Sequence, residues 1–419
     1  MKVKAGALFL VIVVALVISI LTSALVLLAY SNRLYAIQCR QTNRLHTNAD
    51  SGINLLLSDS YSLDYNTVKK VDLFGEENDS VSLKKIHWGL FEVGVSKAFS
   101  DNKSVAKIIQ FGYNPDTLSN AAIYLVDQGR PLSVSGNTII NGNAYLPEAG
   151  IKRAYIEGSS FSGDQLINGI INKSSNKLPA LNKPILDRLL TYFQPGQSYK
   201  ESCIVENDLP KDTLIRSYAD TTLLVQFLGP KEISSETIKG NIILYSDTII
   251  IIDASSHLND IVVYASSVIV KSGFKGNLQI FSMDSIIIEP NCQLDYPSAL
   301  GILKMDYKTT QPFIRVGNNS TIKGILFTYQ NASDLKQTRI TLMQSSLLEG
   351  EAYVDGFFEA DGTINGSVTC SKFLLNTPSA VYENYLLNAV IDITKRSKYY
   401  VGSGMINTGS EKELVKWLY

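Results

Sequence analysis

The chain has 419 residues, of which 45 % are hydrophobic, a length that suits about two or three domains. Its 38 basic and 39 acidic residues give a formal net charge of −1 without a basic stripe, so no electrostatic footprint for nucleic acid is present. The four cysteines lie far apart and lack the Cys/His spacing of a zinc site, so we expect no metal. We expect buried free thiols, with one non-local disulfide left open for an oxidising compartment.

The first predicted element is an uncharged apolar run over residues 5–30, which Lys2 and Lys4 precede. About 20 apolar residues span a bilayer, whereas the apolar core of a signal peptide is about 7–15 residues long. The run therefore predicts a permanent membrane anchor. The helical spacing of apolar residues continues to residue 57, at Leu34, Ile37, Leu45, Ile53 and Leu56, which predicts one long helix rising from the membrane.

Two short motifs frame this helix: Lys2-Val-Lys-Ala-Gly6 before it and Asn48-Ala-Asp-Ser-Gly52 near its end. In this respect residues 1–57 resemble the N-terminal segment of minor pilins and pseudopilins of type IV pilus and type II secretion machines. The resemblance implies leader cleavage between Gly6 and Ala7, although Val11 stands where most major pilins have glutamate. A plain signal anchor is the alternative, because short motifs often match by chance.

The flanking charges do not settle the orientation of the anchor. Lys2 and Lys4 favour a cytoplasmic N-terminus, whereas Arg33, Arg40 and Arg44 on the other flank oppose it. The body that follows is polar and rich in Ser, Thr and Asn, so we expect it outside the cytoplasm. Together with the resemblance, this predicts a single-pass protein of the bacterial inner membrane, with pilus or secretion-system subunits as partners.

Residues 58–135 are predicted to form a small β-rich connector between the helix and the rest of the chain. Strand-like runs at 81–95, 104–111 and 121–126 are bounded by Asn, Asp and Gly. Short strands separated by such turn residues indicate an antiparallel meander.

A repeat over residues 240–289 carries the prediction for the larger part of the chain. Three similar segments start at 241, 260 and 277, spacings of 19 and 17 residues, which is typical of one turn of a β-solenoid. Stacking these segments predicts an aromatic column of Tyr245, Tyr264 and Phe281, and a pairing of Lys271 with Glu289. The fold class is therefore mainly β: a transmembrane helix, a β-rich connector and a right-handed parallel β-helix.

The same alignment predicts a corner at the start of each turn. Gly240, Asn259 and Gly276 are expected to need a positive φ, and the residues after them to form a stacked polar ladder of Asn241, Asp260 and Asn277.

Looser copies of the repeat extend the predicted solenoid over residues 136–373. An interruption near 155–229 contains a short amphipathic helix at 181–193, which we expect to cap one open end of the stack. Residues 374–419 are predicted to be a C-terminal cap, ending in a closing helix at 411–419. Over residues 237–373 the turns resemble bactofilin-like polymer-forming modules, which implies a scaffold as an alternative function.

No catalytic, cofactor or metal site is predicted. Asp247 and Asp284, with Ser266 between them in the same column, are the nearest match to the stacked carboxylates of β-helical enzymes, but we interpret them as caps of the backbone at corners. A β-helical glycan lyase or hydrolase therefore stays an alternative. The 22 tyrosines are expected mostly to pack into the coil, although exposed ones would suit cell-surface glycans. The sequence predicts a membrane-anchored structural protein for adhesion or assembly, and not an enzyme.

Overall fold

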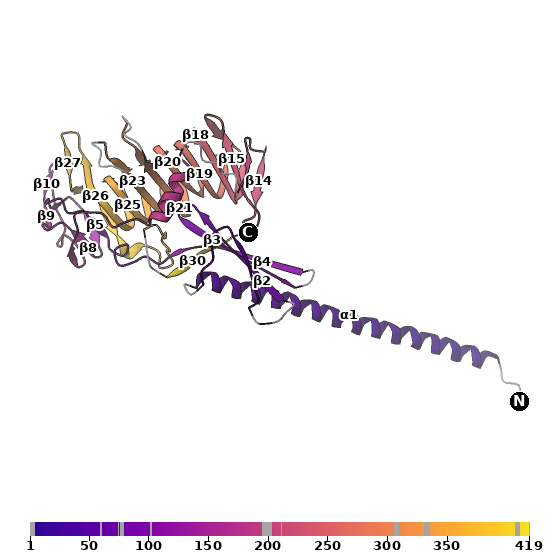
Figure 1. Cartoon of the computed structure of the whole chain (residues 1–419). Helices are drawn as coiled ribbons and strands as arrows, with labels where there is room; N and C mark the ends of the chain where they lie inside the picture. The colour runs from indigo at the N-terminus through magenta and orange to yellow at the C-terminus, as the bar shows by residue number, and fades with distance from the viewer. Residues whose placement is uncertain are drawn as a thin grey trace.

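The computed structural model describes residues 5–58, 61–73, 75, 79–100, 103–194, 203–210, 212–305, 310–330, 336–406 and 411–418. The N-terminal element is α1 (Ala5–Leu57), a helix of 53 residues. About 1.5 Å per residue gives it a length of about 80 Å, and its first part projects far beyond the rest of the molecule (Figure 1). The single long helix predicted for residues 1–57 is confirmed over the described residues.

The second half of α1 packs on a five-stranded antiparallel sheet in the order β1-β2-β3-β4-β30. Its strands are β1 (Val68–Val71), β2 (Asp79–Trp88), β3 (Phe91–Ser100), β4 (Lys103–Tyr113) and β30 (Lys412–Leu418). The antiparallel meander is confirmed for the predicted runs at 81–95 and 104–111, which form β2, β3 and β4. The run at 121–126 was wrongly placed in it, because Ile123–Leu125 pairs in parallel with strands of the second, closed sheet. The predicted closing helix at 411–419 is wrong, because this segment forms β30, which pairs with β4 from the other end of the chain.

Most of the chain forms a closed sheet whose described pairings are parallel, except between β26 and β27. Its strands are β5 (Ile123–Leu125), β7 (Ile139–Asn141), β8 (Ala144–Leu146), β12 (Ile171–Lys173), β13 (Cys203–Glu206), β14 (Thr213–Arg216), β15 (Thr222–Phe227), β16 (Lys231–Ile233), β17 (Thr237–Gly240), β18 (Ile242–Ile252), β19 (His257–Val270), β20 (Lys275–Ile288), β21 (Gln293–Lys304), β22 (Phe313–Val316), β23 (Thr321–Gln330), β24 (Thr338–Leu342), β25 (Leu347–Ala360), β26 (Thr363–Asn376), β27 (Val381–Glu383) and β29 (Val390–Asp392).

Several smaller elements are separate from the closed sheet. A three-stranded sheet has the order β28-β6-β9, and a two-stranded hairpin joins β10 to β11. Their bounds, with those of the remaining helices, are β6 (Leu132–Ser135), β9 (Ile151–Arg153), β10 (Tyr155–Ile156), β11 (Ser159–Ser160), β28 (Tyr385–Leu387), α2 (Lys183–Thr191) and the 3-10 helix η2 (Ile393–Lys395).

Successive turns of the closed sheet do not stack in the order of the sequence. The last turns pair with the first: Val368 of β26 lies opposite Ile123 of β5, and Val390 of β29 opposite Ile139 of β7. From β5 the stack continues through β8 to β12, and the chain then passes through α2 to β13, which pairs with β15 and so starts the long run of turns. The closed sheet thus spans 123–392, beginning inside the predicted connector and ending inside the predicted C-terminal cap.

Two separate hydrophobic clusters follow from this arrangement. The interior of the closed sheet is filled mainly by aliphatic side chains such as Ile250, Val268 and Ile286. A second cluster lies outside it and contains Tyr264 and Phe281 together with side chains of α2 and of the antiparallel sheet. The molecule therefore has three layers, in which the antiparallel sheet separates α1 from the closed sheet (Figure 1).

The aromatic column lies on the outer face of the closed sheet and not in the coil. Tyr245 pairs with Tyr264, and Tyr264 with Phe281, as the alignment of the repeat predicts. The rings of Tyr264 and Phe281 stack with centroids 5.2 Å apart. The expectation that such tyrosines pack into the coil is wrong for Tyr264, because its ring is buried by elements that cover the closed sheet from outside.

Candidate functional site

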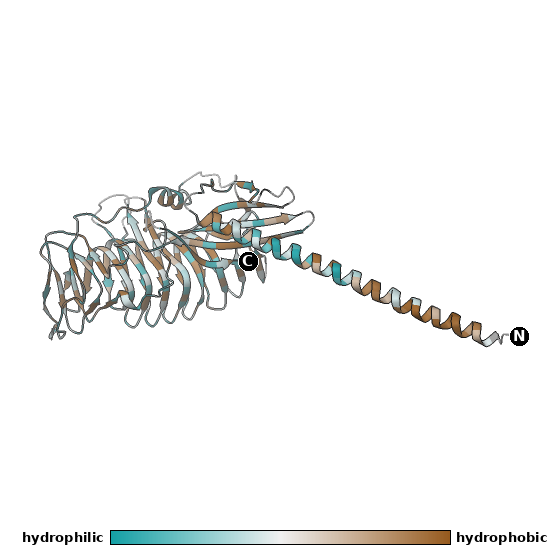
Figure 2. Cartoon of the chain, turned by 90° about the horizontal axis from the view of Figure 1, so that it is seen from below, coloured by the Kyte–Doolittle hydropathy of each residue, from teal (hydrophilic) through white to brown (hydrophobic). Residues whose placement is uncertain are grey.

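The first part of α1 is an apolar surface that no described part of the chain covers. The helix is long and apolar enough to cross a membrane, and its most apolar window has a mean hydropathy of 3.0 and is 0 % buried. Side chains such as Phe9 and Leu27 are 70 % and 67 % exposed. Figure 2 shows the change from this hydrophobic end to a hydrophilic middle of the helix. Residues 6–30 would extend about 38 Å as a helix, which suits a hydrocarbon core of about 30 Å.

The second part of α1 is fixed to the antiparallel sheet. Leu45, Ala49, Ile53 and Leu56 are buried at helical spacing in the cluster that also contains Phe111. A Cβ on Gly52 would lie 2.2 Å from Ser96 Oγ, so glycine permits the close approach of helix and sheet. The Nζ of Lys107 lies 2.5 Å from a carboxylate oxygen of Asp50, which links β4 to the helix. The helix therefore changes from an exposed rod, apolar at first and hydrophilic in its middle, to a packed element between residues 37 and 45.

The residues that resemble a leader site lie at the start of α1. Gly6 is exposed and belongs to the helix, and no atom lies within 4 Å of the position that a Cβ would take there. Ala7 is likewise exposed. Lys2, Val3 and Lys4 lie outside the described residues. Cleavage between Gly6 and Ala7 stays a prediction.

The turn between β2 and β3 joins the antiparallel sheet to the outer face of the closed sheet. Gln279 of β20 accepts a hydrogen bond from the main-chain N–H of Leu90 at 2.8 Å and donates one to the carbonyl of Trp88 at 2.9 Å. The Trp88 indole N–H and the Tyr218 hydroxyl both donate to the carbonyl of Asp260, at 3.1 and 2.6 Å. Since these groups are mostly buried, their loss would leave polar atoms without partners.

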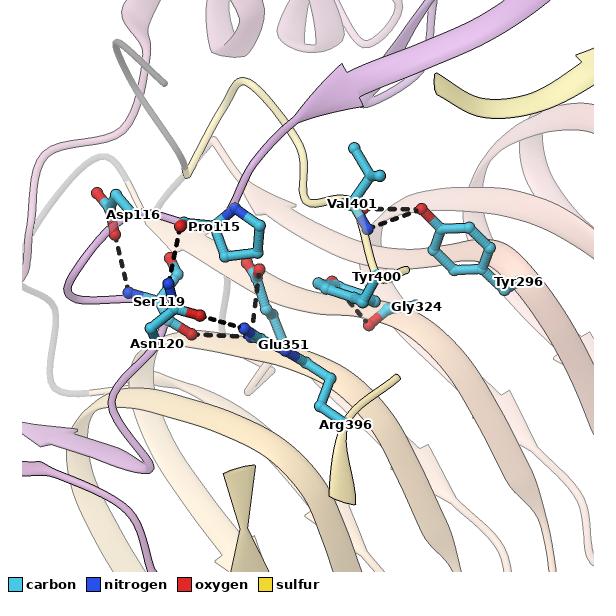
Figure 3. A network of polar contacts seen from close by, with 10 residues as sticks. All are labelled: Pro115, Asp116, Ser119, Asn120, Tyr296, Gly324, Glu351, Arg396, Tyr400 and Val401. Atoms are coloured by element: carbon cyan, nitrogen blue, oxygen red, sulfur yellow. Dashed lines mark hydrogen bonds and ion pairs between the residues drawn. The ribbon is translucent and has the colours of Figure 1, made fainter. Parts of the chain in front are cut away.

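A second connection lies where the chain enters and leaves the closed sheet (Figure 3). Arg396, which follows η2, donates to the carbonyl of Ser119 at 2.8 Å and to Asn120 Oδ1 at 2.5 Å. Its guanidinium lies 3.9 Å from Glu351 of β25, and the two side chains are 8 % and 3 % exposed. The same guanidinium lies over the ring of Tyr400, 5.0 Å from its centroid. One buried cation thus links the entering segment, the leaving segment and the closed sheet.

Helix α2 makes the third connection. The predicted helix is confirmed, with Pro184 in its first turn and Asn182 as its N-cap. The expectation that it caps an end of the stack is wrong, because it packs on the side of the closed sheet. There the ring of Tyr192, which follows the helix, stacks on Tyr264 with centroids 4.0 Å apart. The sequence pattern found the helix but carried no signal for the face that it covers.

The predicted corner ladder is only partly formed. Gly240 has a φ of 94°, as predicted, whereas in the next turn it is Asp260 and not Asn259 that has a positive φ, of 63°. Asn259 pairs directly with Asn277, and Asp260 is the extra residue of a register shift. Asn277 Oδ1 accepts a hydrogen bond from the N–H of Asp260 at 2.7 Å.

The remaining ladder residues have other structural roles. Gly276 lacks a positive φ, but a Cβ there would lie 2.5 Å from the carbonyl oxygen of Leu258. Asn241 is buried, donates to the carbonyl of Asp220 at 3.0 Å and accepts from Thr222 Oγ1 at 2.9 Å. The corner residues therefore hold the backbone in place.

The carboxylates considered for catalysis are not assembled into a metal centre. Ser266 Oγ donates to the main-chain carbonyl of Asp247 at 2.7 Å, and Ser282 Oγ to that of Ser266 at 2.5 Å. The N–H of Asp284 donates to Ser282 Oγ at 3.3 Å. Among the described residues, no group of three or more His, Cys, Asp or Glu could hold a metal ion. The predicted ion pair of Lys271 with Glu289 is confirmed at 3.2 Å.

Comparison with known proteins does not assign the chain to a family. No protein-family model matches the chain, and no curated protein matches it. Among solved structures, the competence-associated pilin ComZ from Thermus thermophilus is similar over 85 % of this chain and 86 % of its own, with 11 % sequence identity and a TM-score of 0.23. A TM-score this low does not establish a common fold, so the functional assignment depends on the geometry of this chain.

Proposed function

We propose that the protein is a membrane-anchored, pilin-like structural subunit of the bacterial inner membrane, with its body outside the cytoplasm. The observation that carries this proposal is the division of α1 into an uncovered apolar part and a part buried on the antiparallel sheet. An apolar rod that projects from a folded body suits either a bilayer or a bundle of similar helices in a pilus-like assembly. The partners are accordingly the membrane and pilus or secretion-system subunits.

The rest of the molecule suits a mechanical role in adhesion or assembly. Three buried connections join the antiparallel sheet, α2 and the closed sheet, so we expect a force on the body to reach α1 without a flexible hinge. In Figure 1 the end of the molecule where β8, β9 and β10 lie is far from the projecting part of α1. Exposed apolar side chains occur in this part of the chain, among them Tyr155 and Ile170, at 73 % and 66 % exposure, and also near the opposite end of the stack, as at Ile215.

We also propose that the closed sheet is a right-handed parallel β-helix. Parallel pairing of each strand with one about a turn away in the stack supports this, and crossovers between parallel strands are right-handed in most proteins. An experimental structure would test the handedness directly. The bactofilin-like scaffold stays an alternative. It would be supported if the closed sheet of this protein were found to face the cytoplasm.

The proposal treats the protein as non-enzymatic, as the sequence predicts, and the main-chain groups of Asp247 and Asp284 have structural hydrogen bonds to Ser266 and Ser282. Cleavage of anionic polysaccharides that disappears in the double variant Asp247→Ala/Asp284→Ala would contradict this and revive the lyase or hydrolase alternative.

The first experiment is the mature N-terminus of the native protein, measured by mass spectrometry on fractionated membranes. A chain that begins at Ala7 and becomes uncleaved in a Gly6→Leu variant would support processing by a prepilin peptidase. An intact Met1 would favour a simple anchor over the pilin-like assembly. A start near residue 32 would contradict the anchor itself.

Protease treatment of spheroplasts then tests the orientation. Digestion of the closed sheet in intact spheroplasts would place it outside the cytoplasm, whereas protection until lysis would contradict the proposal and favour the scaffold. A cytoplasmic marker protein is the control for lysis.

A further inference from the structure

A cavity of about 620 Å³ lies between the outer face of the closed sheet and the segment that leads into α2. Its floor contains Tyr329 of β23, Asp355 of β25 and Ser371 of β26. The residues just before them, Thr328, Val354 and Cys370, pair directly with one another from turn to turn. The floor residues therefore come from three adjacent strands of the stack, at the point where the pairing of β25 with β26 shifts register. A cavity of this size falls in the range of about 300–1,000 Å³ typical of ligand sites.

The roof of the cavity is held in place by hydrogen bonds to the closed sheet. The hydroxyl of Tyr353, which also lines the cavity, donates to the carbonyl of Pro179 at 2.8 Å. Two turns further along the stack, the hydroxyl of Tyr124 donates to the carbonyl of Lys177 at 3.1 Å. The side chain of Asn182 then caps α2 by accepting from the N–H of Ile185. Because the roof is fixed on both sides, the cavity is preformed.

The charges around the cavity balance. Asp187 and Asp355 contribute two carboxylates, and Lys177 and Lys183 two ammonium groups. A polyanion or a polycation would meet as many like charges as opposite ones, so the cavity favours neither.

The floor nevertheless offers strong hydrogen-bond acceptors. Burial raises the pKa of Asp355, while hydrogen bonds from the main chain and side chain of Gln330 and from the side chain of Ser371 act in the opposite direction; the bond from Gln330 Nε2 to Oδ1 is long, at 3.5 Å. Burial raises the pKa of Tyr329 as well, with Asp355 and Asp187 contributing in the same direction. A ligand that donates hydroxyl groups would improve the solvation of the Asp355 carboxylate.

The geometry excludes an extended peptide that would bind as an added strand. The strands beneath the cavity, β23, β25 and β26, already pair with neighbours in the stack, so their main-chain groups present no free edge. What the floor presents is side chains: an aromatic ring, a carboxylate and a hydroxyl on successive turns. Such a surface suits a ligand with apolar faces and many hydroxyl groups.

We propose that this cavity binds a short segment of a neutral glycan, made of uncharged hexose or N-acetylhexosamine units. The ring of Tyr329 stacks on the C–H face of one unit, while Asp355 accepts hydrogen bonds from its hydroxyl groups. Gln128 and Asn176, which also line the cavity, offer amide groups for further hydroxyls or an acetamido group. The inference rests on the proposed function, because the glycan is the ligand that an adhesive subunit would bind.

The test is isothermal titration of the full chain in detergent micelles with three trisaccharides: cellotriose, chitotriose and, as the charged contrast, trigalacturonate. We expect millimolar or tighter binding of at least one of the two neutral trisaccharides. Tyr329→Ala and Asp355→Asn should each weaken that binding about tenfold, a loss of about 1.4 kcal/mol. Tyr329→Phe should retain most of it, since the stacking face remains.

The matched control is Arg315→Ala. Arg315 lines a separate cavity of about 470 Å³, so its replacement should leave trisaccharide binding unchanged. Thermal unfolding of each variant checks that the fold is retained. Three results would overturn the proposal: no binding of either neutral trisaccharide, tighter binding of trigalacturonate, or equal binding by wild type, Tyr329→Ala and Asp355→Asn. Failure here is distinguishable from failure of the proposed function, which the mature N-terminus and the membrane orientation test without any glycan.

Discussion

The antiparallel sheet and the closed sheet bury their apolar side chains in opposite ways. The antiparallel sheet is built mainly from neighbours in the sequence, and it covers one face with α1 and the other with the second body (Figure 1). The closed sheet buries an aliphatic interior by closing on itself, yet it carries aromatic rings on its outer face. Each body therefore has one face that only the other covers, and we expect the two to unfold together.

The place where the chain crosses between the bodies supports this dependence. The N–H of Asn114, after β4, donates to the carbonyl of Glu411, before β30, at 2.9 Å, and Tyr113 and Gly402 exchange two main-chain hydrogen bonds. The whole closed sheet thus leaves and returns at one point of the antiparallel sheet. The chain can leave and return at one point because the turns do not stack in sequence order. The first and last turns of the closed sheet are neighbours, since β5 pairs with β26.

The largest effect is expected inside the closed sheet, where glycines stack from turn to turn. Gly350 has a φ of 147°, and a Cβ there would lie 2.0 Å from the carbonyl oxygen of Gly324. Gly366 lies on its other side in the same column. Because the backbone is held between two turns, we expect Gly350→Ala to reduce the free energy of unfolding by at least about 4 kcal/mol, measured by chemical denaturation.

Gly129→Ala is the matched control, because Gly129 also has a positive φ but no atom lies within 4 Å of its Cβ position. We expect a loss of only about 1 kcal/mol there. If Gly350→Ala unfolds the closed sheet while the Trp417 signal of the antiparallel sheet stays native, the two bodies are independent and the comparison above is wrong.

The second largest effect is expected at the connection in Figure 3. Arg396→Met removes the cation from Glu351, whose side chain is 3 % exposed, and should lower the free energy of unfolding by about 3 kcal/mol, measured by denaturant titration. The double variant Arg396→Met/Glu351→Leu should recover a large part of the loss, because no buried carboxylate then remains. A double variant as unstable as the single one would show that packing, and not charge, holds this connection.

Local patterns in the sequence predicted both bodies but not how they are joined. The helical spacing in residues 5–57 and the alternation around β2 to β4 are local, and the repeat at 241, 260 and 277 fixed the register of Tyr245, Tyr264 and Phe281. Residues 411–419 were misassigned because β30 is defined by its partner β4, which lies about 300 positions earlier in the chain. The stacking of β26 against β5 is equally non-local, and no spacing in the sequence records it.

The residues of the candidate site likewise fall into those that the sequence could predict and those that it could not. The apolar helix could be predicted, because composition alone determines it. Gln279, Arg396 and Tyr218 carried no signal, since each is defined by groups that meet it only in the folded chain. The predicted corner ladder is wrong at Asp260, because one extra residue there shifts the register of the strand pairing. An alignment of the repeats without gaps does not reveal such a shift.

A pH-dependent effect is expected at the antiparallel sheet, from His87. Its ring stacks on Tyr65 with centroids 3.2 Å apart, and burial, with Arg188 and Lys85 adding to it, lowers its pKa from 6.5 to about 2. His87 therefore takes up a proton below about pH 6.5 in the unfolded chain, but only near pH 2 in the folded chain. The free energy of unfolding accordingly decreases as the pH falls from 6.5 towards 2. For a fully buried group the loss is about 1.4 kcal/mol per pH unit, and the partial exposure of His87 should reduce it.

The measurement is the midpoint of thermal unfolding between pH 7 and pH 4, compared with a His87→Phe variant that keeps an aromatic ring beside Tyr65. The variant should show the weaker decline. Parallel declines in the two proteins would mean that His87 is not the group that senses the pH. Asp355, whose pKa burial raises, contributes with the opposite sign and stays present in both proteins.

The smallest effect is expected where the two bodies are most alike, at their partly exposed ion pairs. Lys271 lies 3.2 Å from Glu289 on the closed sheet, and Lys107 is paired with Asp50 between β4 and α1. All four side chains remain partly exposed, so water and salt screen the attraction, and Lys271→Met and Lys107→Met should each cost less than about 1 kcal/mol. Denaturant titrations at low and high salt measure this, and the difference between wild type and variant should shrink at high salt. A larger, salt-independent loss at Lys107 alone would mean that its pairing with Asp50 fixes α1 on the sheet, and the helix would then be attached by charge as well as by its apolar face.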